Sequence, residues 1–250
     1  MNCRTIDDVL ARLDAIIGRC HERGSRLGYF PAMYRKTTAE VKKGIEQGRF
    51  EDPVRMERLD VVFAERYLRA VDQHDRGQRP AAAWDYAFRM GRSPEPTVIQ
   101  HLLLGMNAHI NLDLGISAAG VAPGAALESL RHDFDVINAI LGELVDLVQS
   151  DLAGVFPLLG VLDFLCLRFD EMAVQRAIVR ARAAAWDKAR TLAWSAPGSE
   201  RETRIAEYDR QTVRLARTIC SPEPGGTAGT LRENIADAAT IRGVIEALVD

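Results

Sequence analysis

One uncharged stretch constrains this chain more than any other feature. From Thr97 to Leu112 there is no Lys, Arg, Asp or Glu, and such a segment is typical of a helix buried on most sides. The stretch and the residue after it nevertheless carry polar side chains at His101, Asn107, His109, Asn111 and Asp113. Burying a polar group without a partner costs roughly 1–3 kcal/mol. We therefore predict a buried central helix at about 97–115, whose polar side chains form either a structural hydrogen-bond network or an active site.

Helical spacing of apolar residues dominates the rest of the sequence, and no alternating β-branched run lies between turn signals. Besides the central helix, this spacing predicts a first helix capped by Thr5 and further helices at about 31–47, 53–74, 81–90, 125–150, 157–194, 199–218 and 230–248. We expect an all-α fold, a single compact multi-helix bundle. In that bundle the helices at 53–74, 125–150 and 157–194 surround the central helix.

The C-terminal region is expected to be an addition to the bundle. Residues 1–220 form the predicted bundle domain, and residues 221–230 form a flexible linker rich in Pro and Gly. Residues 231–250 then form a C-terminal helix with an apolar stripe, which must be covered by the bundle or by a second chain. Packing on the bundle is the prediction, and the oligomeric state is left as monomer or homodimer.

Composition excludes several classes of protein. Lys and Arg number 32 against 35 Asp and Glu, so no basic excess points to nucleic acid. No run of 18 apolar residues is present that could span a membrane, and the N-terminus lacks the pattern of a signal peptide. Four scattered cysteines without CxxC spacing indicate free thiols in a reducing compartment. We expect a cytoplasmic protein, and the abundance of Ala, Arg and Asp suggests a bacterial source.

Two polar stripes are predicted on the central helix. His101, Gly105, His109 and Asp113 follow one another at four-residue spacing on one face, and Asn107 and Asn111 lie on the opposite side. A structural interpretation makes His109 and Asp113 a hydrogen-bonded pair that fixes the ring within the core. A functional interpretation makes His109 an acid/base group oriented by Asp113, with His101 as the third catalytic candidate.

Carboxylates from other helices can reach the same interior. Asp60, Asp133 and Asp163 lie within apolar runs, and Arg58 and Arg168 are the predicted structural partners for such buried charges. A divalent metal held by His101, His109 and Asp133 is the cofactor hypothesis. Asp60 is the alternative carboxylate, and a proton relay is the alternative to a metal site. The candidate substrate contacts are Asn107, Asn111, Tyr29 and Asp60, while Tyr34 and Arg35 serve equally well as packing or substrate-contact groups.

A second hypothesis rests on the order of His101, the dipeptide His132-Asp133, and a later Asp163 or Asp170. This order resembles that of HD-domain metal-dependent hydrolases and oxygenases, which are all-α proteins. A single HD dipeptide is a weak motif. The small residues that usually follow it are replaced here by Phe134-Asp135.

Three segments together resemble a known family. They are Leu27-Gly28-Tyr29-Phe30, the segment Arg55–Ala64, and the stretch that begins at His101 and contains Gly-Met-Asn-Ala-His-Ile-Asn-Leu-Asp. The sequence is similar here to a bacterial family of helical domains of unknown function, over roughly residues 25–190. The resemblance implies an all-α fold and the location of the site, and it implies no activity.

The sequence leads to one functional hypothesis and two alternatives. We expect an enzyme acting on a small, largely apolar molecule in bacterial specialised metabolism, through acid/base or metal-assisted chemistry of the buried His/Asp/Asn cluster. The first alternative is a non-catalytic helical module that binds a hydrophobic ligand or a protein partner. The second is the HD-like hydrolase or oxygenase.

Overall fold

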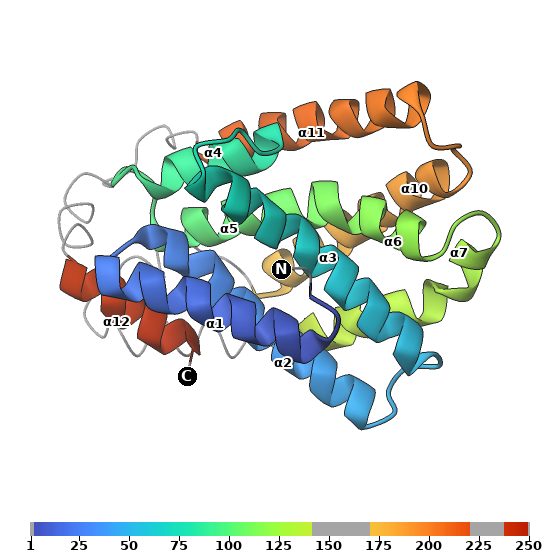
Figure 1. The fold of residues 1–250 in the computed structure, drawn as a ribbon, viewed down its shortest axis with the longest axis horizontal. Coiled ribbons are helices and arrows are strands. Elements are labelled where there is room, and N and C mark those ends of the chain that lie inside the picture. Colours follow the sequence, from blue (N-terminus) through green and yellow to red (C-terminus); the bar gives the residue numbers. More distant parts are fainter. Residues whose placement is uncertain (1–2, 142–170, 221–237, 250) are drawn as a thin grey trace.

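The computed structural model of this protein describes residues 3–141, 171–220 and 238–249 (Figure 1). Over these residues the chain forms helices and no strand, which confirms the predicted all-α fold. The helices before the central segment are α1 (Ile6–Arg23), η1 (Arg26–Gly28), α2 (Tyr29–Glu46), α3 (Pro53–Asp75) and α4 (Ala82–Gly91). The remainder are α5 (Val98–Ala108), η2 (His109–Leu114), α6 (Gly115–Val121), α7 (Ala126–Ser129), α10 (Glu171–Ala193), α11 (Ser199–Ile219) and α12 (Ala238–Val249).

Side-chain caps fix where three of these helices begin. Thr5 caps α1 in a capping box with Asp8, as the sequence predicted for Thr5. Asp52 accepts a hydrogen bond from the backbone N–H of Arg55 and caps α3, with Pro53 at the first helical position. Thr97 and Gln100 form a second capping box that starts α5. These caps satisfy backbone donors that a helix start otherwise leaves without partners.

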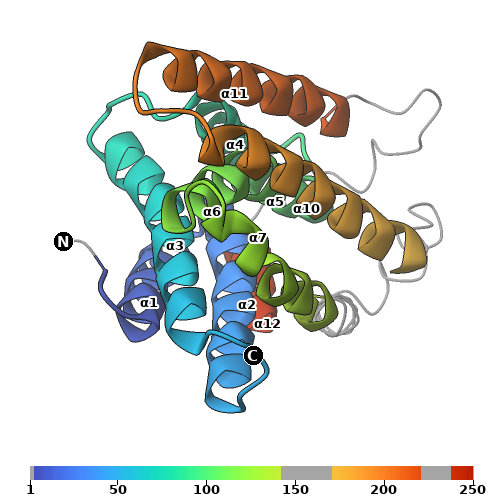
Figure 2. The same ribbon diagram turned by 90° about the vertical axis from the view of Figure 1, so that its right-hand side faces the viewer.

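A continuous helical rod of α5, η2 and α6 lies at the centre of the bundle. The helix α5 packs against α2, α4 and α11, while η2 and α6 pack against α3 and α10. Figure 2 shows α10 and α11 on one side of this rod and α1, α2 and α12 on the other. The predicted central helix is therefore present, but α2, α4 and α11 are neighbours that the sequence analysis did not place beside it.

The central rod departs from prediction at two points. Its middle turn, η2, is a π-helix rather than an α-helix. The rod also continues past Gly115 to Val121, so Gly115 does not end it. Gly115 instead permits close packing, because a Cβ atom there would lie 2.7 Å from the carbonyl oxygen of Ala185 in α10. The absence of a side chain at Gly115 thus lets the central rod and α10 pack closely, and it does not end the helix.

Other predicted boundaries also shift. The expected helix at 125–150 is interrupted, because α7 ends at Ser129 and a separate helix occupies 131–141. The second predicted helix starts at Tyr29, two residues before Pro31. Residues 142–170, which include much of two predicted helices, lie outside the described residues, and so do Asp163, Arg168 and Asp170.

Two clusters of buried apolar side chains make up the described core. The first joins α1, α2, α3, α4, α5 and α12, and the second joins α6, α7, the helix at 131–141 and α10. The helix α3 runs through both clusters. Within η2, Leu112 belongs to the first cluster and Leu114 to the second. The π-helical turn therefore lies at their junction.

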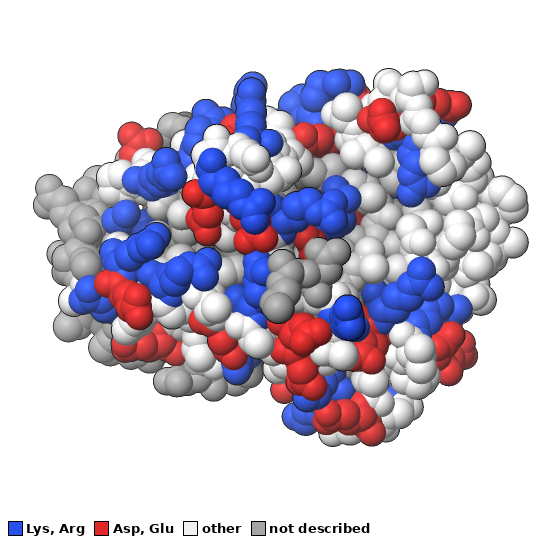
Figure 3. Space-filling view, viewed as in Figure 1, with Lys and Arg blue, Asp and Glu red and all other residues white. Residues whose placement is uncertain are grey.

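The C-terminal helix α12 packs on α1 and α2 of its own chain (Figure 1). Its apolar stripe is buried there through Ile241, Val244, Ile245 and Leu248. The predicted linker at 221–230 lies outside the described residues. None of the described helices is both long and apolar enough to cross a membrane. On the face drawn in Figure 3, Lys and Arg are interspersed with Asp and Glu, and the end that carries α6 and α7 is largely uncharged.

Candidate functional site

His109 is a deeply buried titratable side chain on the central rod. It begins the π-helical turn and is 3% exposed. Its imidazole stacks on the ring of Phe63 from α3, with ring centroids 3.5 Å apart and planes 10° apart. The ring of Tyr34 from α2 meets it edge-on at 4.5 Å. The aromatic enclosure is completed by Phe30, Tyr67 and Trp84.

Asp113 lies near the C-terminal end of the π-helical turn. Its Oδ1 accepts a hydrogen bond from Nε of Arg66 at 2.6 Å, and its Oδ2 accepts one from the indole N–H of Trp84 at 2.7 Å. The Nδ1 atom of His109 lies 3.6 Å from the same Oδ2. Asp113 is thus fixed by an ion pair and an indole, and it presents its carboxylate to the imidazole.

Burial and charge set the protonation of this pair. Burial lowers the pKa of His109; Asp113 partly offsets that effect, and Arg66 adds to it. Burial acts to raise the pKa of Asp113, but His109, Arg66 and Trp84 outweigh it, and the pKa falls below its usual value. A neutral imidazole therefore faces an ionised carboxylate at neutral pH. The position of Asp113 beside Nδ1 favours the Nδ1–H tautomer and leaves Nε2 as an acceptor.

Several buried polar atoms on His109 and on the neighbouring helices α2 and α3 lack a well-aligned hydrogen-bond partner. They are both ring nitrogens of His109, the hydroxyls of Tyr34 and Thr38, and Oδ2 of Asp60. Burial, followed by the charge of Asp60, raises the pKa of Tyr34 well above its usual value; the adjacent hydroxyl of Thr38 partly offsets this, and the charge of Asp113 adds to it. The charges of both carboxylates therefore act on the Tyr34 hydroxyl. More than nine in ten buried polar groups in proteins are paired, so a group of unpaired ones calls for an explanation.

Asp60 is the carboxyl group best suited to exchange a proton near pH 7. Burial, followed by the charge of Glu57, raises its pKa to about 7. It lies on α3 one helical turn before Phe63, the residue that stacks on His109. We refer to Tyr34, Asp60, His109 and Asp113 as the interior cluster. Asp60, His109 and Asp113 were sequence-predicted candidates, and the structure places all three on the helices that meet here.

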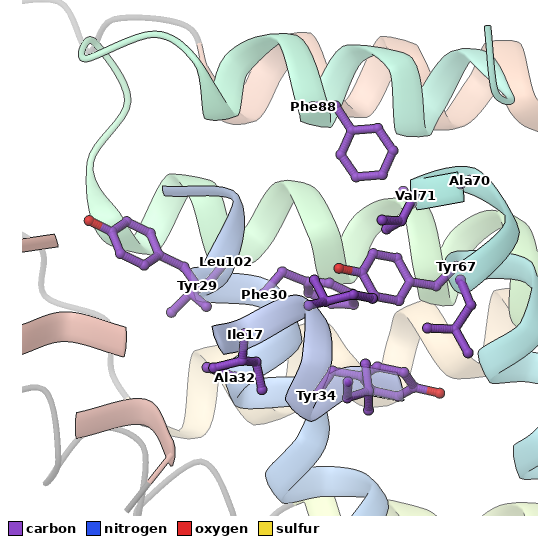
Figure 4. Close-up of a cluster of buried hydrophobic side chains, with 14 of the residues drawn as sticks. Ile17, Tyr29, Phe30, Ala32, Tyr34, Tyr67, Ala70, Val71, Phe88 and Leu102 are labelled. Atoms are coloured by element: carbon purple, nitrogen blue, oxygen red, sulfur yellow. The ribbon is translucent and has the colours of Figure 1, made fainter. Parts of the chain in front are cut away.

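His101 and Tyr29 lie apart from the interior cluster. Their rings meet edge-on with centroids 5.8 Å apart, and burial lowers the pKa of His101 to about 4. Phe30 separates them from His109, since its ring occupies the space over Gly105 between the two histidines. In Figure 4 the hydroxyls of Tyr29 and Tyr34 lie at opposite ends of the group of buried hydrophobic side chains drawn there. The structure thus brings Tyr34, and not Tyr29, to His109.

Asn107 and Asn111 face away from His109, as their separate stripe predicted. The amide of Asn107 donates to the carbonyl oxygen of Thr212 in α11 at 3.0 Å. The amide of Asn111 donates to the side-chain oxygen of Asn107 at 3.1 Å. The two asparagines fasten the central rod to α11, on the side opposite the aromatic enclosure.

Asp133 has a different setting from the one the metal hypothesis required. It accepts hydrogen bonds from the backbone N–H groups of Glu51 and Asp52 and pairs with Arg55, just before and within the first turn of α3. Its cationic partner is therefore Arg55 and not the predicted Arg58. Among the residues that the structure describes, no three His, Cys, Asp or Glu side chains lie close enough to hold a metal ion, so His101, His109 and Asp133 are not brought together.

The HD dipeptide is divided between two environments. His132 is exposed, whereas Asp133 is fully buried. The later aspartates of that motif, Asp163 and Asp170, fall outside the described part of the chain. Arg35, the other early candidate, forms a surface ion pair with Asp14.

Sequence reasoning missed the residues that hold the pair in place. Arg66 lies on α3 between the buried residues Ala64 and Tyr67. From the sequence alone, an arginine at such a position is expected to face solvent. Trp84 and Phe63 were not among the candidates, because their contacts with Asp113 and His109 come from tertiary structure. Only Asp113 gave a sequence signal for these partners, because a buried carboxylate requires a cation.

Comparison with known proteins places the chain in a family. Residues 6–222 match DUF5995, a family of unknown function, and the chain belongs to it. The match confirms the family resemblance and extends beyond residues 25–190 at both ends. No curated protein and no solved structure matches the chain.

Proposed function

We propose that this protein is an enzyme that transfers protons to or from a small, largely apolar molecule at the interior cluster. The observation that carries the proposal is a set of buried polar atoms without a well-aligned hydrogen-bond partner on His109, Tyr34 and Asp60. His109 and Tyr34 lie inside the aromatic enclosure, and Asp60 lies on α3 one turn before Phe63. Leaving such atoms unpaired is costly, and a bound molecule would supply the missing partners. Aromatic walls with a few convergent polar groups are typical of small-molecule sites.

Each member of the cluster has a chemical role in this proposal. Neutral His109 accepts a proton at Nε2, and ionised Asp113 orients the ring and stabilises the imidazolium that forms. Asp60 gains or loses a proton near neutral pH because burial raises its pKa to about 7. Tyr34 keeps its proton and donates a hydrogen bond to an oxygen of the bound molecule, because its pKa is raised.

A test compares purified variants in one assay. Wild-type protein is incubated with a bacterial small-molecule extract, and compounds consumed or formed are followed by mass spectrometry. We expect His109→Gln to abolish any conversion that the wild type performs, while its circular dichroism stays helical. His132→Gln is the matched control, because His132 is exposed and is not one of the rings that surround His109.

A second outcome favours the non-catalytic alternative. If the wild type converts nothing and His109→Gln lowers the melting temperature strongly, the interior cluster is structural and the enzyme proposal fails. The ion pair of Asp113 with Arg66 and its indole hydrogen bond are the contacts on which such a structural role would rest. Equal conversion by the wild type and His109→Gln also overturns the proposal.

A further inference from the structure

The geometry of the interior cluster depends on the π-helical turn. His109 is the first residue of η2 and Asp113 the fifth, so the winding of this one turn sets the angle between imidazole and carboxylate. In an α-helix, residues four apart lie above one another on the same face. A π-helical turn is wider, is rare, and occurs mostly as a single turn at functional sites. Something must therefore hold this turn against rewinding.

Lys188 of α10 contacts the backbone of the turn directly. Its Nζ donates a hydrogen bond to the carbonyl oxygen of Asn111 at 2.5 Å and lies 5.3 Å from the ring centroid of Tyr208 in α11. Burial lowers the pKa of Lys188. Within the described part of the chain no carboxylate pairs with it, so its ammonium is directed to a backbone carbonyl.

The surrounding contacts press α10 against the same turn. The Cβ atom of Lys188 would lie 3.1 Å from a Cβ atom built on Gly115, the residue that follows η2. Asn111, whose carbonyl binds Lys188, also donates its amide to Asn107, which is tied to Thr212. The outer side of the turn is thus fixed by α10 and α11, while its inner side carries His109 and Asp113.

We propose that Lys188 is a positioning residue that holds the π-helical turn and thereby sets the geometry of the His109–Asp113 pair. It touches neither the pair nor the aromatic enclosure in any described contact, and it acts through the carbonyl of Asn111. Misplacing a reacting group by about 1 Å can cost on the order of 10²-fold in rate. The catalytic part of this inference rests on the proposed function, whereas the geometric part does not.

The test uses nuclear magnetic resonance of the full-length protein labelled at its five histidines. Because the ring of Phe63 stacks on the imidazole, we expect it to shift the ring-proton signals of His109 in the wild type. We expect Lys188→Met, which removes the donor and keeps the aliphatic stem, to move the His109 ring signals and leave those of exposed His132 in place. Conversion, where the wild type shows any, is expected to fall on the order of 10²-fold.

Two variants control the result. Lys42→Met removes a lysine that pairs with Asp7 on the surface, and it is expected to leave the His109 signals unchanged. Lys188→Arg restores a donor and is expected to return the signals toward their wild-type positions. If Lys188→Met does not fold, Lys188→Gln is measured in the same way. Unchanged His109 signals in a folded Lys188 variant overturn the inference. If the His109 signals shift in Lys188→Met but the wild type converts no compound, only the proposed function is overturned.

Discussion

Gly105 faces the ring of Phe30 so closely that a Cβ atom on Gly105 would lie 2.3 Å from a ring carbon. This glycine lets Phe30 reach the space between His101 and His109, where the ring closes one side of the aromatic enclosure. A helix-interior glycine costs roughly 1 kcal/mol relative to alanine. Here the missing side chain is a requirement of packing rather than of backbone conformation.

Gly105→Ala is therefore expected to destabilise the protein by about 1–3 kcal/mol, because Phe30 must move to admit the methyl group. Gly18→Ala in α1 is the matched control, since nothing lies within 4 Å of a Cβ atom there. That control is expected to gain up to about 1 kcal/mol. Urea denaturation of both variants measures the difference, and equal effects would show that Phe30 is not held by Gly105.

Arg66→Met tests the support of Asp113. Removing the guanidinium leaves the carboxylate of Asp113, whose side chain is 1% exposed, without its cation. Breaking a fully buried pair costs roughly 3–5 kcal/mol, and we expect about 2 kcal/mol because Arg66 is partly exposed and water can replace it. Since Arg66 also lowers the pKa of His109, that pKa should rise in the variant. A titration of His109 by nuclear magnetic resonance that matches the wild type would contradict this assignment.

Asp60 makes stability depend on pH. Its pKa is about 7 in the folded protein against an ordinary value of 3.8, so between these values the folded state binds more protons than the unfolded state. The contribution of Asp60 to stability is consequently fully present below about pH 4 and is lost as pH rises from there through about 7, by on the order of 4 kcal/mol. Asp60→Asn removes this loss. The advantage of the variant over wild type should grow from pH 5 to pH 8 in urea denaturation, and a constant difference would count against the raised pKa.

The sequence predicted the central rod well because its signal is local. The absence of charge from Thr97 to Leu112 indicates burial without reference to any other helix. The two polar stripes also follow from helical spacing, and the structure places them against different neighbours. The π-helical turn was not predictable from local spacing, because its contacts with α10 join residues far apart in sequence, such as Lys188 and Asn111, which are 77 residues apart.

The sequence did not indicate which cation pairs with each buried carboxylate. Asp133 was correctly expected to be buried, but its partners are Arg55 and two backbone N–H groups. Periodicity indicates which side chains face inward, and it does not indicate which of several arginines reaches a given carboxylate. Tyr29 and Tyr34 illustrate the same limit, because only tertiary packing separates the tyrosine beside His101 from the one beside His109.

The C-terminal helix is expected to stabilise the chain that carries it. Ile245 is 1% exposed, and its Cδ1 would lie 2.6 Å from a Cβ atom on Gly28. Ile245→Ala should lower the free energy of unfolding by about 2–5 kcal/mol through lost burial and the cavity left behind. The melting temperature should not depend on protein concentration, because α12 covers its own chain. A melting temperature that rises with concentration would indicate that a second chain takes part.

The most direct test of the interior cluster is Tyr34→Phe, measured for stability and conversion on the same sample. The Tyr34 hydroxyl is buried without a well-aligned partner, so removing it should not weaken the fold. The account predicts a free energy of unfolding equal to or above that of the wild type, together with loss of conversion in the extract assay. A variant destabilised by more than about 1 kcal/mol that still converts the same compounds would contradict it, because the hydroxyl would then be part of the structure rather than of the chemistry.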